Sequence, residues 1–72
     1  MTANEEKLLL IAMEEAETDS LALTSRIEDY FDSLEYVDYL MVLREKLGPL
    51  PESIITSAET FGDLARAYAP AS

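Results

Sequence analysis

Apolar residues recur at helical spacing near the start of the chain. Asn4 is followed by Glu5 and Glu6, and apolar residues continue from there to Ala16. Asn is a favourable helix cap, and acidic residues stabilise the first turn of a helix because they face the positive end of its dipole. The pattern therefore predicts a helix over about residues 4–17, capped by Asn4.

Residues 18–32 lack helical periodicity, although large apolar side chains are spread along them. We expect a long loop here, fixed to the core by Leu21, Leu23, Ile27, Tyr30 and Phe31. Loops of this length are uncommon inside compact domains and often have a function. The segment is thus of functional as well as structural interest.

A second helix is predicted over residues 33–47, where Asp32 or Ser33 supplies the cap and Gly48 and Pro49 end the helix. Two apolar stripes run along this helix. One is suited to burial and consists of Tyr36, Leu40, Leu43 and Leu47. The other lies next to Ser33, is bordered by acidic residues, and consists of Leu34, Val37 and Met41.

Two shorter patterns complete the helical prediction. Residues 52–56 predict one helical turn, and Thr60 with Asp63 resembles a capping box at the start of a last helix that ends before Pro70. The apolar face of that last helix consists of Phe61, Leu64, Ala65 and Tyr68. We therefore predict an all-α fold, a small four-helix bundle with three principal helices and a short third helix, in one domain over residues 1–72.

Composition narrows the possible functions. The chain has no Cys and no His, which excludes disulfides, thiolate nucleophiles, imidazole bases and the usual soft-metal sites. Fifteen acidic against five basic residues give a formal charge of −10, which repels nucleic acid and anionic lipid. This charge favours partners with basic patches, and the alternative is that it only keeps a small protein soluble. The longest apolar run, residues 8–13, is far shorter than the about 20 residues of a membrane span. We expect a cytoplasmic monomer without a targeting segment that binds neither membranes nor nucleic acid.

Carboxylates are the remaining candidates for catalysis or metal binding. The acidic cluster at the end of the first predicted helix consists of Glu14, Glu15, Glu17 and Asp19. It lacks the alternating spacing and the internal glycine of an EF-hand loop, so we predict a solvated helix end and no metal site. A domain this small also offers little room for a cleft that would shift the pKa values of paired carboxylates. We therefore expect no catalytic residue and no enzymatic activity.

The second predicted helix is similar to the second helix of acyl carrier proteins. The run Asp32-Ser33-Leu34 opens it, and the positions that match the family further along are Glu35, Val37, Asp38, Leu40-Met41 and Leu43. The segment Thr60-Phe61-Gly62-Asp63-Leu64 resembles the start of the family's last helix, and Ile27-Glu28-Asp29-Tyr30 resembles the approach to the modified serine. The resemblance extends over about residues 27–68.

This resemblance implies that a phosphopantetheinyl transferase moves 4'-phosphopantetheine from coenzyme A to Ser33. The terminal thiol of this arm would then hold an acyl group as a thioester, in a specialised fatty acid, polyketide or related pathway. The resemblance also implies that acidic residues meet basic patches on acyl-loading and acyl-processing enzymes, namely Asp32, Glu35, Asp38 and Glu45. The apolar surface that contacts partners or shelters the arm would consist of Leu34, Val37, Met41 and Ile54.

The chain also departs from the family pattern. Tyr30 and Phe31 run directly into Asp32 without the usual glycine, and Arg44 stands where family members more often have an acid. These differences predict partners other than those of a general fatty acid synthase.

A second class of function fits the same composition. An acidic helical module without a prosthetic group could bind a basic partner through the Leu34, Val37 and Met41 face. Ser33 would then be a helix cap, and Ser33→Ala would cost about 0.5–2 kcal/mol of stability without loss of binding.

Overall fold

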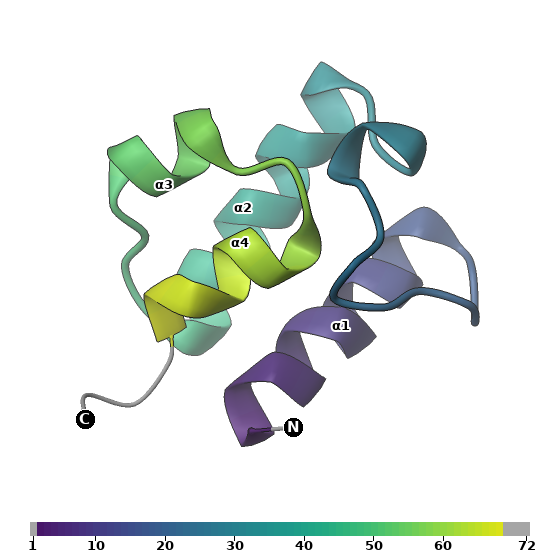
Figure 1. Cartoon of the computed structure of the whole chain (residues 1–72), viewed down its shortest axis with the longest axis horizontal. Helices are drawn as coiled ribbons and strands as arrows, with labels where there is room; N and C mark the ends of the chain where they lie inside the picture. Colours follow the sequence, from purple (N-terminus) through teal and green to yellow (C-terminus); the bar gives the residue numbers. More distant parts are fainter. Residues whose placement is uncertain (1, 69–72) are drawn as a thin grey trace.

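The computed structural model describes residues 2–68, which form four α-helices and two short 3-10 turns (Figure 1). In chain order the elements are α1 (Ala3–Ala16), η1 (Ile27–Asp29), α2 (Ser33–Leu47), α3 (Glu52–Ser57), α4 (Phe61–Ala65) and η2 (Arg66–Tyr68). No β-strand occurs within these residues, and the extended pairing is limited to one isolated bridge between Arg26 and Thr60. The all-α, four-helix prediction is confirmed.

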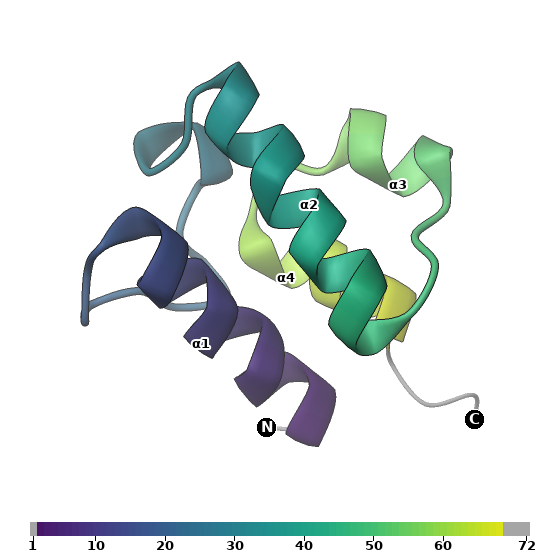
Figure 2. The ribbon, with the colours of Figure 1, turned by 180° about the vertical axis from the view of Figure 1, so that it is seen from behind.

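The helices pack around a single core. α1 packs against α2 and α4, and α3 contacts α4. Figure 2 shows α1 and α2 side by side, with α4 behind them. The buried apolar residues are Leu8, Leu9, Ala12, Ile27, Phe31, Tyr39, Leu40, Leu43, Leu50, Phe61, Leu64, Ala65 and Tyr68. Every helix except the short α3 therefore contributes fully buried side chains to one hydrophobic centre.

The cap of α1 corrects the sequence prediction. Thr2, and not Asn4, precedes the helix: the Thr2 hydroxyl accepts from the Glu5 N–H at 3.2 Å, and Glu5 accepts from the Thr2 N–H at 2.8 Å. The Asn4 side chain instead donates to the Tyr68 carbonyl oxygen at 3.0 Å. The helix begins earlier because Thr2 and Glu5 have the three-residue separation of a capping box, which satisfies two backbone N–H groups where Asn4 would satisfy one.

α2 has the predicted bounds, and its buried stripe is shifted. Leu40 and Leu43 are buried as expected, whereas Tyr36 and Leu47 are half-buried. Tyr39, which the predicted stripe omitted, is fully buried, and its hydroxyl donates to the Leu8 carbonyl oxygen at 2.9 Å. This bond lets a tyrosine occupy the core because its one polar group is paired.

The last helix is shorter than predicted. The capping box between Thr60 and Asp63 is present, but α4 ends at Ala65 and tightens into the 3-10 turn η2. The predicted apolar face is confirmed, since all four of its residues are buried. The predicted end before Pro70 lies outside the described residues. α3 extends one residue beyond the expected turn, to Ser57.

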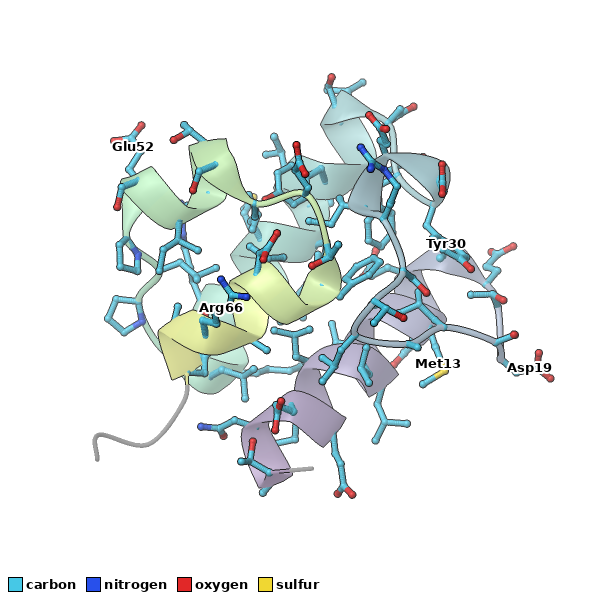
Figure 3. All side chains as sticks on the ribbon, viewed as in Figure 1. Met13, Asp19, Tyr30, Glu52 and Arg66 are labelled. Atoms are coloured by element: carbon cyan, nitrogen blue, oxygen red, sulfur yellow. The ribbon has the colours of Figure 1, made fainter. Side chains whose placement is uncertain are left out.

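The predicted loop over residues 18–32 is fixed to the core as expected and contains the turn η1. Ile27 and Phe31 are buried, and the Tyr30 hydroxyl donates to the Ser20 carbonyl oxygen at 3.2 Å. Figure 3 shows Tyr30 and Asp19 on the same side of the molecule. No helix between residues 2 and 68 combines the length and the apolar character that crossing a bilayer requires.

Gly62 lets this loop approach α4 closely. Its N–H donates to the Leu23 carbonyl oxygen at 2.8 Å, and a Cβ at this position would lie 3.1 Å from that same oxygen. Contacts this short are rare for a real Cβ, so a side chain at Gly62 would push the Leu23 carbonyl oxygen away by a few tenths of an ångström. The glycine thus maintains the junction between the loop and the last helix.

Burial of tyrosine predicts a specific response to alkaline pH. Burial raises the pKa of Tyr39 far above its ordinary value, and the neighbouring Tyr68 and Tyr36 add to the shift. In the unfolded chain the Tyr39 hydroxyl ionises near its ordinary pKa, at lower pH than in the folded protein. The contribution of this tyrosine to the free energy of unfolding is therefore fully present below about pH 10 and falls by about 1.4 kcal/mol per pH unit as pH rises further. Denaturant titrations from pH 8 to 11 should show this loss. The free energy of unfolding of Tyr39→Phe should fall less over this pH range. The same dependence on pH in both proteins would contradict the expectation.

Candidate functional site

Ser33 is the first residue of α2, and its hydroxyl is not used to hold the helix. The helix is capped by Asp32, whose Oδ1 accepts from the Glu35 N–H at 2.8 Å. The Glu35 Oε1 in turn accepts from the Asp32 N–H at 3.0 Å. Ser33 is exposed, and within residues 2–68 its hydroxyl has no hydrogen-bond partner. The alternative in which Ser33 caps the helix is therefore wrong.

The first turn of α2 also carries unpaired backbone donors. Among the described residues, no acceptor is found for the N–H groups of Ser33 and Leu34, whereas those of Glu35 and Tyr36 bond to Asp32. Free N–H groups at the positive end of a helix dipole favour an anionic oxygen nearby. An exposed hydroxyl in this setting fits a phosphodiester, so the residues present are compatible with the arm that the sequence suggested.

A hollow of about 260 Å³ adjoins Ser33. Its walls come from the loop before α2, from α2 itself and from the segment before α4, and include Arg26, Phe31, Tyr36 and Glu59. The Tyr36 hydroxyl donates to the Ile55 carbonyl oxygen at 3.2 Å, which ties α2 to α3 beside this hollow. Figure 2 shows the first turn of α2 at one end of the molecule, next to η1.

The apolar stripe next to Ser33 faces solvent. Leu34 is 78 % exposed, Val37 52 % and Met41 60 %. The acidic residues that border the stripe, Glu35, Asp38 and Glu45, are exposed as well. Large exposed hydrophobic side chains are unusual when they are grouped on one helix face, and such a group often marks an interaction site.

Two other sequence predictions concern residues beyond this face. Ile54 is half-buried and packs against the core, so only part of its side chain is available to a partner. The acidic cluster near the end of α1 does not bring three or more carboxylates together, and no group of that kind that could hold a metal ion occurs among residues 2–68.

Comparison of the chain with protein-family models, curated proteins and solved structures finds no match. The residues themselves must therefore support any assignment. The structure places Asp32 at the cap of α2 and Ser33, Leu34 and Glu35 on its first turn. The other predicted residues on the same helix are Val37, Asp38, Met41 and Glu45.

Sequence reasoning missed Arg26 as part of this site. The residue lines the hollow beside Ser33, and its Nη2 lies 3.1 Å from Glu28 Oε1. Hydrophobic periodicity could not identify Arg26, because its place beside Ser33 depends on the backbone bridge to Thr60, which is distant in the sequence. Its rarity was the available signal, since it is one of only five basic residues in a chain of net charge −10.

Proposed function

We propose that this protein is a carrier that holds an acyl group on a 4'-phosphopantetheine arm attached to Ser33. The observation that carries the proposal is the state of the Ser33 hydroxyl: it is exposed, and the helix cap is supplied by Asp32 and Glu35 instead. A serine that the fold does not need, at the positive end of a helix, is suited to modification by a phosphate-linked group. The carrier would work in the cytoplasm and catalyse no reaction itself.

The proposed attachment is a phosphoryl transfer from coenzyme A. The Ser33 Oγ forms a bond to the phosphorus next to pantetheine, and the bond from that phosphorus to the bridging oxygen of the pyrophosphate breaks. Adenosine 3',5'-bisphosphate leaves, and the hydroxyl proton passes to a base of the transferase. The arm supplies a terminal thiol that carries the acyl group as a thioester and keeps it at high effective concentration near partner enzymes.

The transfer itself tests this function. The wild-type protein is incubated with coenzyme A and a phosphopantetheinyl transferase of broad specificity, and its intact mass is measured. We expect a gain of one phosphopantetheinyl group. A folded protein that gains no mass with any of several transferases would favour the acidic interaction module without a prosthetic group.

The exposed stripe is the proposed docking surface for the transferase and for acyl-processing enzymes. Acidic residues beside it would attract basic patches, and the apolar side chains would be buried on contact. Met41→Ala should lower kcat/KM for loading about fivefold, because truncation of an apolar side chain that is buried on contact costs about 1 kcal/mol.

Leu10→Ala provides the matched control for that experiment. Leu10 lies on α1 and is 62 % exposed, against 60 % for Met41, so the two truncations remove similar exposed apolar surface. Loading of Leu10→Ala should equal that of the wild type. Equal losses in both variants, or no loss in Met41→Ala, would count against docking through the stripe.

A further inference from the structure

Arg26 lines the same hollow as Ser33, and we propose that its guanidinium binds the phosphate of the arm attached to Ser33. The inference rests on the proposed carrier function and adds a residue that positions the arm. Among residues 2–68, Arg26 is the only basic residue that lines this hollow, whereas Glu28, Asp32 and Glu59 are acidic. A phosphate in the hollow would therefore have a single cationic neighbour there.

The backbone around Arg26 is fixed by pairing with the segment that leads into α4 and with the first residue of that helix. The Ile27 N–H donates to the Glu59 carbonyl oxygen at 2.9 Å, and the Phe61 N–H donates to the Ser25 carbonyl oxygen at 3.2 Å. These bonds surround the isolated bridge that Arg26 itself forms with Thr60. The backbone of Arg26 is thus restrained by hydrogen bonds at both neighbouring residues, although it lies in a loop.

The segment between Arg26 and Ser33 is also hydrogen-bonded. The N–H groups of Tyr30 and Phe31 both donate to the Ile27 carbonyl oxygen, at 3.0 and 2.9 Å, and the Phe31 side chain is buried. This compact turn leads directly into the cap of α2. Arg26 and Ser33, which both line the hollow, are therefore joined by a hydrogen-bonded piece of backbone.

The present partner of Arg26 leaves most of its donors available. Glu28 Oε1 lies 3.1 Å from Nη2 and accepts from Nε at 3.3 Å, while the two side chains are 52 % and 72 % exposed. Ion pairs this exposed are weak because water screens them. A guanidinium has five N–H donors in a planar fork that matches phosphate oxygens, so Arg26 can bind a phosphate beside or in place of Glu28.

The acidic residues of the hollow increase the importance of a contact between Arg26 and the phosphate. Three carboxylates line the hollow, and each would repel the negative charge of a phosphodiester. Arg26 offsets part of that repulsion at short range. Without it, the phosphate should move away from the hollow and the first segment of the arm should become less ordered.

Phosphorus NMR of the loaded protein tests the proposal. The variants are Arg26→Ala, Arg26→Lys and the control Arg66→Ala. Arg66 is also an arginine in a surface ion pair, with Asp63 at 3.7 Å, and its side chain is 82 % exposed on the last turn (Figure 3). Each protein is loaded enzymatically, the mass gain is verified, and the resonance of the phosphodiester is recorded. A second readout is the Arg26 Nε–H resonance of the wild type before and after loading.

We expect Arg26→Ala to displace the phosphodiester resonance, Arg26→Lys to restore part of the wild-type position, and Arg66→Ala to leave it unchanged. The Arg26 Nε–H resonance should shift on loading. Full mass gain with the same phosphorus resonance in wild type and Arg26→Ala would overturn the role of Arg26 and leave the carrier function intact. Absence of mass gain in the wild type would overturn the carrier function, and the role of Arg26 with it.

Discussion

Replacing Ser33 with alanine should abolish attachment of the arm and leave stability almost unchanged. The free energy of unfolding should stay within about 0.5 kcal/mol of the wild type, because the side chain is exposed and forms no hydrogen bond within residues 2–68. Denaturant unfolding measures the change in stability. The intact mass after incubation with coenzyme A and a transferase measures attachment of the arm.

Asp32→Ala serves as the contrast for stability. Its carboxylate accepts from the Glu35 N–H, and its removal should cost about 0.5–2 kcal/mol. Ser33 is therefore expected to be needed for attachment of the arm, and Asp32 for stability of the helix. A loss above 1 kcal/mol in Ser33→Ala, or retained loading of that variant, would show that the assignment of roles on this turn is wrong.

Phe61→Ala should lower the free energy of unfolding by about 3–5 kcal/mol. Phe61 is fully buried, and its ring centroid lies 6.1 Å from that of Tyr30, 5.8 Å from Phe31 and 5.9 Å from Tyr39. The cavity would open where α4, the loop and α2 meet. Small domains have only about 5–15 kcal/mol of stability in total, so the variant should be partly unfolded at 37 °C.

Urea denaturation followed by circular dichroism measures this effect. Phe61→Leu keeps an apolar side chain in the same place and should lose clearly less stability than Phe61→Ala. A loss below about 1 kcal/mol in Phe61→Ala would contradict the packing of the aromatic cluster, because full truncation of a buried ring costs more than that.

The sequence was sufficient to predict the elements whose ends have local chemical signals. α2 has the predicted bounds because a cap before Ser33 and the Gly48-Pro49 pair after Leu47 mark both of its ends. Gly48 adopts a φ of 111°, a conformation that favours glycine and stops the helix. The N-terminal cap was mistaken because Asn4 is a good cap by residue type, whereas Thr2 forms a reciprocal pair with Glu5.

Features that depend on distant contacts could not be predicted. Tyr39 is buried because its hydroxyl reaches the Leu8 carbonyl oxygen on another helix, and nothing on α2 alone indicates that partner. The hollow beside Ser33 likewise depends on the bridge between Arg26 and Thr60, which are far apart in the chain. The sequence therefore indicated the candidate serine and its exposed apolar neighbours, and the structure was needed to show that Arg26 lines the same hollow as Ser33.

The carrier function is tested most directly by locating the modification. The wild-type protein is incubated with coenzyme A and a phosphopantetheinyl transferase, digested, and analysed by tandem mass spectrometry. We predict one phosphopantetheinyl group, found on Ser33, with Ser53 and Ser57 unmodified. A group on another serine, or an unmodified Ser33 in a folded protein after treatment with several transferases, would contradict the proposal.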